Sequence, residues 1–397
     1  MIEAKQIPLI STYLNRLDDT LKEKSRIEQA SDRGKYPKYL AVSEAIDTYF
    51  IYHKLRACCS ELSFRLFNNP QKLKHHLSDF KFIAIIKYEI AAYLDEEKNP
   101  DIVAYWNLFA LLEESYKQTL TKKNEAKYVS EAAYHSYFEW LQKHRTKMIL
   151  DDVQGILSIL TNLVANSNLP KKYWFLLNNE LINTLGKKEK LPKGVYKNII
   201  LLAYKVKDET IFQNMETNGL TKFTNRYEWA KKFCRAYEKR LLEDDRTYIP
   251  FCKSYIEYQK NNLKQAYQYL EGLDYSREMF IKLNIKVLHI QIMIDAILGG
   301  VHLRIDKQMS DKLTKVLGSL YKQINAEQSD LSTKHFLYYK NMYDFLQNIW
   351  KLYPKRVTMT LKELQQKRLS LKIEIKKCRL IHEQADWLLA KVEQIQR

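Results

Sequence analysis

Apolar residues in the stretch 227–291 recur at helical spacing, and turn-forming residues interrupt them at short intervals. The first segment repeats its large apolar residues every fourth position, at Trp229, Phe233, Tyr237 and Leu241. This spacing places them on one face of a helix. A second apolar segment stops at the pair Asn261-Asn262, where turn geometry is tolerated, and a third begins at Leu263. The pattern predicts consecutive helices joined by short turns.

A helix, a short turn and a second helix, repeated along the chain, is the signature of a helical solenoid. Small Ala266 stands where two such helices would cross closely, as in a tetratricopeptide-like joint. The whole sequence has only 9 glycines and 8 prolines, which argues against folds with many tight β-turns and against glycine-rich phosphate loops. We therefore predict an all-α protein, an α-solenoid of antiparallel helix pairs that is tetratricopeptide-like.

Helix-breaking residues predict four regions in the chain. These are an N-terminal helix and linker at 1–40, an N-terminal helical array at 41–186, tetratricopeptide-like repeats at 195–353, and a C-terminal capping helix at 358–397. The basic segment 186–194 has glycine at both ends and is the expected hinge. Thr360 and Glu363 form a capping-box pattern, so we expect the last helix to begin there and to continue towards Ile395.

Cysteine usage and hydropathy limit the class of protein. Five cysteines without a CxxC pair predict reduced thiols, a cytoplasmic location and no metal site. No apolar run approaches the roughly 20 residues that a membrane span requires. No catalytic or nucleotide-binding motif is present, so we expect a protein that is not an enzyme and has no cofactor. Asp151-Asp152 is interpreted as a helix-start pair, and His289 as a core histidine.

The net charge of +18 is unevenly distributed. Residues 171–207 hold nine lysines against two glutamates, and residues 351–397 hold twelve lysines and arginines against five acidic residues. Such an excess favours an acidic partner, whether nucleic acid, an acidic protein or an anionic membrane surface. The alternative is that the lysines form a solvated face. Arginine rarely clusters with aromatic residues here, which weakens the case for sequence-specific base readout.

Candidate binding residues lie in both basic segments. The first set is predicted to form a cationic lip on a solenoid edge and comprises Lys171, Lys172, Lys187, Lys188, Lys190 and Lys193. The second set lies on the predicted last helix and comprises Arg368, Lys372, Lys376 and Arg379. Its last three members follow i, i+4 and i+7 spacing and would share a face. The apolar residues of that helix are expected to cap the array.

Four segments carry a family resemblance: residues 45–56, 195–200, 229–237 and 385–391. In this order they resemble an uncharacterised family of helical-repeat proteins common in Bacteroidota. The resemblance implies that most of residues 40–397 share that fold. It also implies an additional N-terminal helical region in most members, and an insertion here at 216–225. The family has no established activity, so the resemblance implies none for this chain.

These observations predict a non-catalytic helical-repeat scaffold that binds a protein partner through its concave surface. The alternative function is backbone-directed binding of RNA or DNA through the lysine-rich segments, which would be strongly salt-dependent and weakly sequence-selective.

Overall fold

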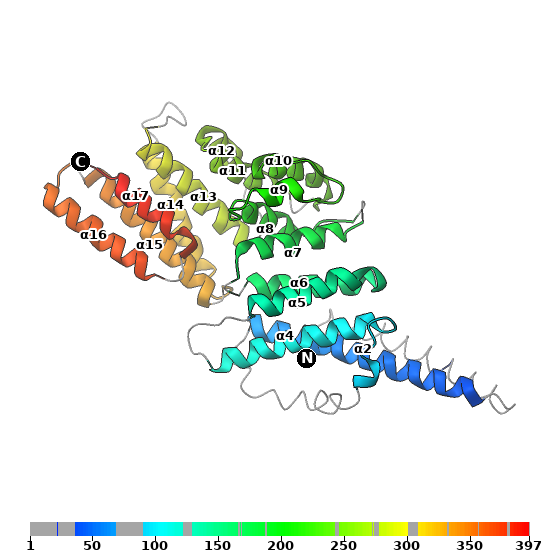
Figure 1. The fold of residues 1–397 in the computed structure, drawn as a ribbon. Helices are drawn as coiled ribbons and strands as arrows, with labels where there is room; N and C mark the ends of the chain where they lie inside the picture. The colour runs from blue at the N-terminus through cyan, green and yellow to red at the C-terminus, as the bar shows by residue number, and fades with distance from the viewer. Residues whose placement is uncertain are drawn as a thin grey trace. The chain divides into compact units, whose positions relative to one another are not determined.

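The computed structural model describes most of the chain (Figure 1). The described residues are 22, 36–68, 90–121, 129–165, 167, 169–186, 189–242, 246–271, 273, 278–300, 309–331, 333–355, 357–378 and 382–396. Within these ranges the regular structure is helical, and the β-contacts reduce to an isolated bridge between Thr217 and Leu220. The all-α prediction is therefore confirmed. The chain divides into two compact units, Met1–Thr184 and Leu185–Arg397, next to the expected hinge.

The first unit contains five described α-helices. They are α2 (Tyr36–Asn68), α4 (Pro100–Thr121), α5 (Glu131–His144), α6 (Leu150–Ala165) and α7 (Lys171–Asn183). The packed pairs are α2–α4, α4–α5 and α6–α7, and α6 also packs on α2 and α4. Ser130 caps α5, because its hydroxyl accepts a hydrogen bond from the Ala133 amide at 3.1 Å. Apart from Lys22, the predicted N-terminal helix before residue 36 lies outside the described residues.

The second unit continues the pattern of adjacent packing. Its described α-helices are α8 (Lys193–Ala203), α9 (Thr210–Asn214), α10 (Arg226–Tyr237), α11 (Tyr248–Gln259), α12 (Leu263–Leu270), α13 (Met279–Leu298), α14 (Met309–Ala326), α15 (Thr333–Lys355), α16 (Leu361–Lys377) and α17 (His382–Gln394). From α10 onwards each helix contacts the next one along the chain. Consecutive helix packing is thus observed over the segment that the apolar spacing singled out.

The predicted apolar face of α10 lies in the core of the second unit. Trp229, Phe233 and Tyr237 are buried, and their rings stack in sequence with centroids 5.0 and 4.6 Å apart. Asn261 adopts a left-handed φ of 60°, which ends α11 and starts the turn into α12. The Ser254 hydroxyl then donates to the Ala266 carbonyl at 2.8 Å. The small side chain at position 266 permits this close approach of the two helices.

Helix α13 is buried on nearly all sides. It contacts α11, α12, α14, α15 and α17, and even Lys286, His289 and Gln291 on it are largely buried. A helix that is apolar all round belongs in the interior of a domain. Helix α13 is therefore the central helix around which the later helices of this unit pack.

The prediction of a single C-terminal helix is wrong. Thr360 begins α16 with the expected capping box, but Cys378 leaves helical geometry with ψ of 92°, and α17 starts at His382. Helix α17 packs on α16, α15 and α13 (Figure 1). Leu388, Val392 and Ile395 are fully buried there. A continuous helix would leave these three side chains in water, so the burial of apolar area favours the folded-back arrangement.

Candidate binding site

The first predicted lysine set is divided between the two units. Lys171 and Lys172 begin α7, and their ammonium groups lie over the rings of Trp174 and Tyr173 at 5.2 and 4.9 Å. These contacts are cation–π interactions. In the other unit Lys190 is exposed. Lys193 pairs with Glu278, while Lys187 and Lys188 lie outside the described residues. The continuous cationic lip stays a prediction.

The second predicted set is partly used within the fold. The Arg368 guanidinium donates hydrogen bonds to the carbonyl oxygens of Val392 and Glu393 at 3.0 and 2.9 Å. Lys372 pairs with the Glu393 carboxylate at 2.8 Å. Both cations therefore hold the C-terminal end of α17, where the helix dipole favours positive charge. Lys376 is exposed, and Arg379 lies outside the described residues.

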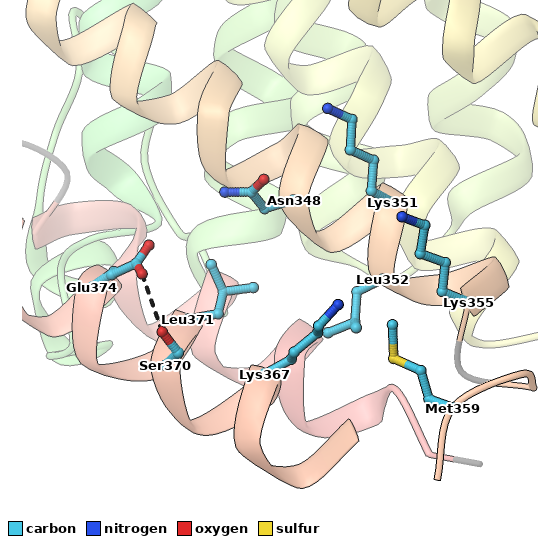
Figure 2. Close-up of a pocket in the computed structure, with 9 residues that line it drawn as sticks. All are labelled: Asn348, Lys351, Leu352, Lys355, Met359, Lys367, Ser370, Leu371 and Glu374. Carbon is cyan, nitrogen blue, oxygen red and sulfur yellow. Dashed lines mark hydrogen bonds between the residues drawn. The ribbon is translucent and has the colours of Figure 1, made fainter. Parts of the chain in front are cut away.

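A surface pocket that the sequence analysis missed lies between α15 and α16 (Figure 2). Its cavity has a volume of about 240 Å³. Its lining residues come from α15, the connection after it and α16, and are Asn348, Lys351, Leu352, Lys355, Met359, Lys367, Ser370, Leu371 and Glu374. This is the pocket on which the functional argument rests.

Three lysines supply the positive charge of the pocket. Lys351 and Lys355 are one turn apart on α15, and Lys367 reaches in from α16 (Figure 2). All three side chains are exposed. The nearby Glu363 is already engaged, because its carboxylate accepts hydrogen bonds from the backbone and side chain of Thr360 at 2.9 Å each. In the part of the chain that the structure describes, no ion pair within 4 Å is recorded for these lysines, although Lys367 and Lys351 interact electrostatically with the carboxylates of Glu363 and Asp344.

The floor and rim of the pocket differ in polarity. Leu352 and Leu371 are buried and Met359 is half-buried beneath the lysines. The Ser370 hydroxyl donates to the single lining carboxylate, Glu374, at 3.2 Å (Figure 2). An apolar floor beside three ammonium groups can accommodate an anionic group next to an apolar one. The excess of positive charge in residues 351–397 indicated a basic region, but it did not indicate which lysines would line the same pocket.

A buried carboxylate connects three helices of the first unit. Asp152 of α6 is fully buried and accepts hydrogen bonds from Tyr52 of α2 and from Tyr105 of α4, the latter at 2.8 Å. Arg56 lies 3.3 Å from the same carboxylate. Burial, reinforced by the carboxylate, raises the pKa of both tyrosine hydroxyls. Asp152 lies in the first turn of α6, as the interpretation as a helix-start residue expects, but its side chain points into the core and pairs with residues of α2 and α4.

Neither a protein-family model, nor a curated protein, nor a solved structure matches the chain. Among the described residues, no group of three or more histidines, cysteines, aspartates and glutamates is arranged to hold a metal. No described helix is long and apolar enough to cross a membrane. The functional argument therefore depends on the pocket.

Proposed function

We propose that this chain is a non-catalytic helical-repeat scaffold, tetratricopeptide-like and cytoplasmic, that binds a protein partner. The observation that carries the proposal is the pocket between α15 and α16, which is lined by three lysines together with Leu352, Met359 and Leu371. Surfaces that combine an apolar centre with a charged rim are typical of protein interfaces. The proposed binding surface is the concave face of the helical repeats.

The order of helix packing supports a solenoid. Within the second unit each helix from α10 to α17 contacts its successor. Where helix pairs stack in this order, a partner can contact several pairs at once, although α13 itself is covered on nearly all sides. The resemblance to the Bacteroidota helical-repeat family is part of the same proposal, and so is the cytoplasmic location, which agrees with the five free cysteines.

Binding of an RNA or DNA backbone is the second candidate function. Lys351, Lys355 and Lys367 could pair with phosphates, and such binding would weaken steeply as salt is added. The lining of the pocket favours the protein partner instead. None of the described residues that line it is aromatic, whereas single-stranded nucleic acids are commonly held by stacking of bases on aromatic rings.

Affinity purification tests the proposal. The tagged full-length chain is used to capture partners from native lysate, half of it treated with nuclease, and the captured proteins are identified by mass spectrometry. We expect a defined protein that is retained after nuclease treatment and in moderate salt. Recovery of nucleic acid, with the proteins lost after nuclease treatment, would contradict the scaffold proposal and support the alternative.

A further inference from the structure

The geometry of the α15–α16 pocket points to a ligand class: we propose that it binds an acidic peptide segment of the partner. Carboxylates of that segment pair with Lys351, Lys355 and Lys367, and an adjacent apolar side chain lies on the floor of the pocket. This inference rests on the proposed scaffold function and adds the chemistry of the partner.

Charge complementarity is the first argument. Three lysines from two helices line the cavity, against one lining carboxylate, Glu374. That carboxylate accepts a hydrogen bond from Ser370, and no described ion pair balances the lysines. Two of the three lysines are spaced i, i+4 on α15, so their charges lie on the same side of the helix. An anionic ligand relieves the repulsion between them.

The size and floor of the pocket are the second argument. At about 240 Å³ the cavity is smaller than the roughly 300–1,000 Å³ of typical small-molecule sites. It is suited to one side chain of a longer ligand rather than to a complete cofactor. Leu352, Met359 and Leu371 form an apolar floor, which a phosphate backbone would leave unused and an aliphatic side chain would cover.

Substitution of Glu374 tests whether the pocket prefers an acidic or a basic ligand. Its carboxylate lies at the rim on α16 and repels an acidic ligand, so Glu374→Gln should strengthen binding of an acidic peptide by about twofold or more. A pocket that recognised a basic ligand would respond in the opposite direction.

The test uses the full chain and a fluorescein-labelled peptide in which acidic residues alternate with leucine, measured by fluorescence anisotropy. We expect weak binding, with a Kd between about 10 µM and 1 mM, because the ion pairs are exposed and a single apolar side chain is buried. Two matched peptides, one with leucine replaced by serine and one with the acids replaced by their amides, should each bind more weakly. A uridine-rich RNA of equal charge serves as the nucleic-acid ligand.

Charge-reversal variants test whether the peptide binds at the pocket lysines. The triple variant Lys351→Glu, Lys355→Glu and Lys367→Glu should weaken peptide binding by at least about tenfold. The control triple variant carries the same charge change at exposed lysines outside the pocket, namely Lys315→Glu, Lys322→Glu and Lys362→Glu, and should change affinity by less than about twofold. All six side chains are exposed, so both variants should fold, which circular dichroism and Tm verify.

Three results would overturn the inference. They are no peptide binding at about 1 mM, equal weakening by both triple variants, or tighter binding of the RNA than of the peptide. The scaffold proposal is tested separately. If the pocket triple variant still captures the protein partner from lysate, the inference fails and the scaffold function stands. If no protein is captured by the wild-type chain, the scaffold function itself fails.

Discussion

Asp295 of α13 and Lys391 of α17 form an ion pair, with 2.8 Å between Oδ1 and Nζ, in which both side chains are largely buried. The other carboxylate oxygen accepts hydrogen bonds from Tyr258 of α11 at 2.7 Å and from Trp387 of α17 at 3.2 Å. The carboxylate at position 295 therefore attaches the last helix of the chain to the buried helix α13.

Removing this carboxylate should loosen the C-terminal helix. Asp295→Ala leaves Lys391 and Tyr258 without their partner in a poorly hydrated site, and should lower the free energy of unfolding by about 2–3 kcal/mol. Asp295→Asn keeps an acceptor for Tyr258 and should cost less. Urea denaturation gives the free energies, and hydrogen exchange should show faster exchange in α17. An unchanged unfolding midpoint for Asp295→Ala would refute the role of this ion pair.

Arg368 is expected to act on stability and not on ligand affinity. Arg368→Met keeps an aliphatic side chain but removes the hydrogen bonds to the carbonyls of Val392 and Glu393, so unfolding should become easier by about 1–2 kcal/mol. The matched control is Lys376→Met, at an exposed position on the same helix, and it should change stability by less than about 0.5 kcal/mol. Equal stability of the two variants, measured by denaturation, would contradict this assignment.

The buried carboxylate of Asp152 is expected to stabilise the first unit. Asp152→Ala removes the acceptor of Tyr52 and Tyr105 and leaves Arg56 without its anionic partner. It should lower the free energy of unfolding by about 3 kcal/mol. Tyr105→Phe removes one hydrogen bond and should cost about 1 kcal/mol. A double-mutant cycle between positions 105 and 152 should give a coupling energy above about 0.5 kcal/mol. Additive effects in denaturation experiments would exclude the proposed hydrogen bond.

His289 should make stability depend on pH. Burial, together with the neighbouring charge of Lys312, lowers its pKa to about 4, while Glu271 acts in the opposite direction and Tyr267 packs against the ring. Between pH 6.5 and 4 the unfolded chain therefore binds a proton that the folded chain does not. Stability contributed by the neutral ring is complete above pH 6.5 and is lost as the pH falls towards 4, by about 3 kcal/mol at most.

The variant His289→Leu isolates this effect. Neither ring nitrogen of His289 has a hydrogen-bond partner among the described residues, so leucine should be tolerated or stabilising at pH 7. The difference in unfolding free energy between variant and wild type should grow in favour of the variant as the pH falls from 6.5 to 4. A difference that is independent of pH would show that His289 is not buried in its neutral form.

Much of the local structure was predictable because its causes lie within a few residues. The Ser130 cap, the Thr360–Glu363 capping box and the ring stack that begins at Trp229 each depend on side chains three or four positions apart. Asn261 ends its helix for the same local reason. The starts of the helices at Ser130 and Thr360 follow from these local signals, whereas the C-terminal end of the helix that begins at Thr360 does not.

The candidate site was less predictable. The sequence analysis selected Arg368 and Lys372, which the structure uses to hold α17, and missed Lys351, Lys355 and Lys367. A charge surplus locates a basic segment but does not determine which ammonium groups face a cavity. That depends on how α15 and α16 pack, which in turn depends on residues far apart in the chain.

The sequence by itself determined the helical class, the capping of helices at Ser130 and Thr360, and the basic character of the C-terminal region, since helical periodicity, capping and charge are properties of neighbouring residues. Only the tertiary structure decided that the last helix breaks at Cys378 and folds back. It also decided that Asp152 and Asp295 lie among distant tyrosines, and that three lysines line one cavity between α15 and α16. The physical reason is that burial of apolar area acts between distant segments, and the polar groups which this burial brings together must then be paired.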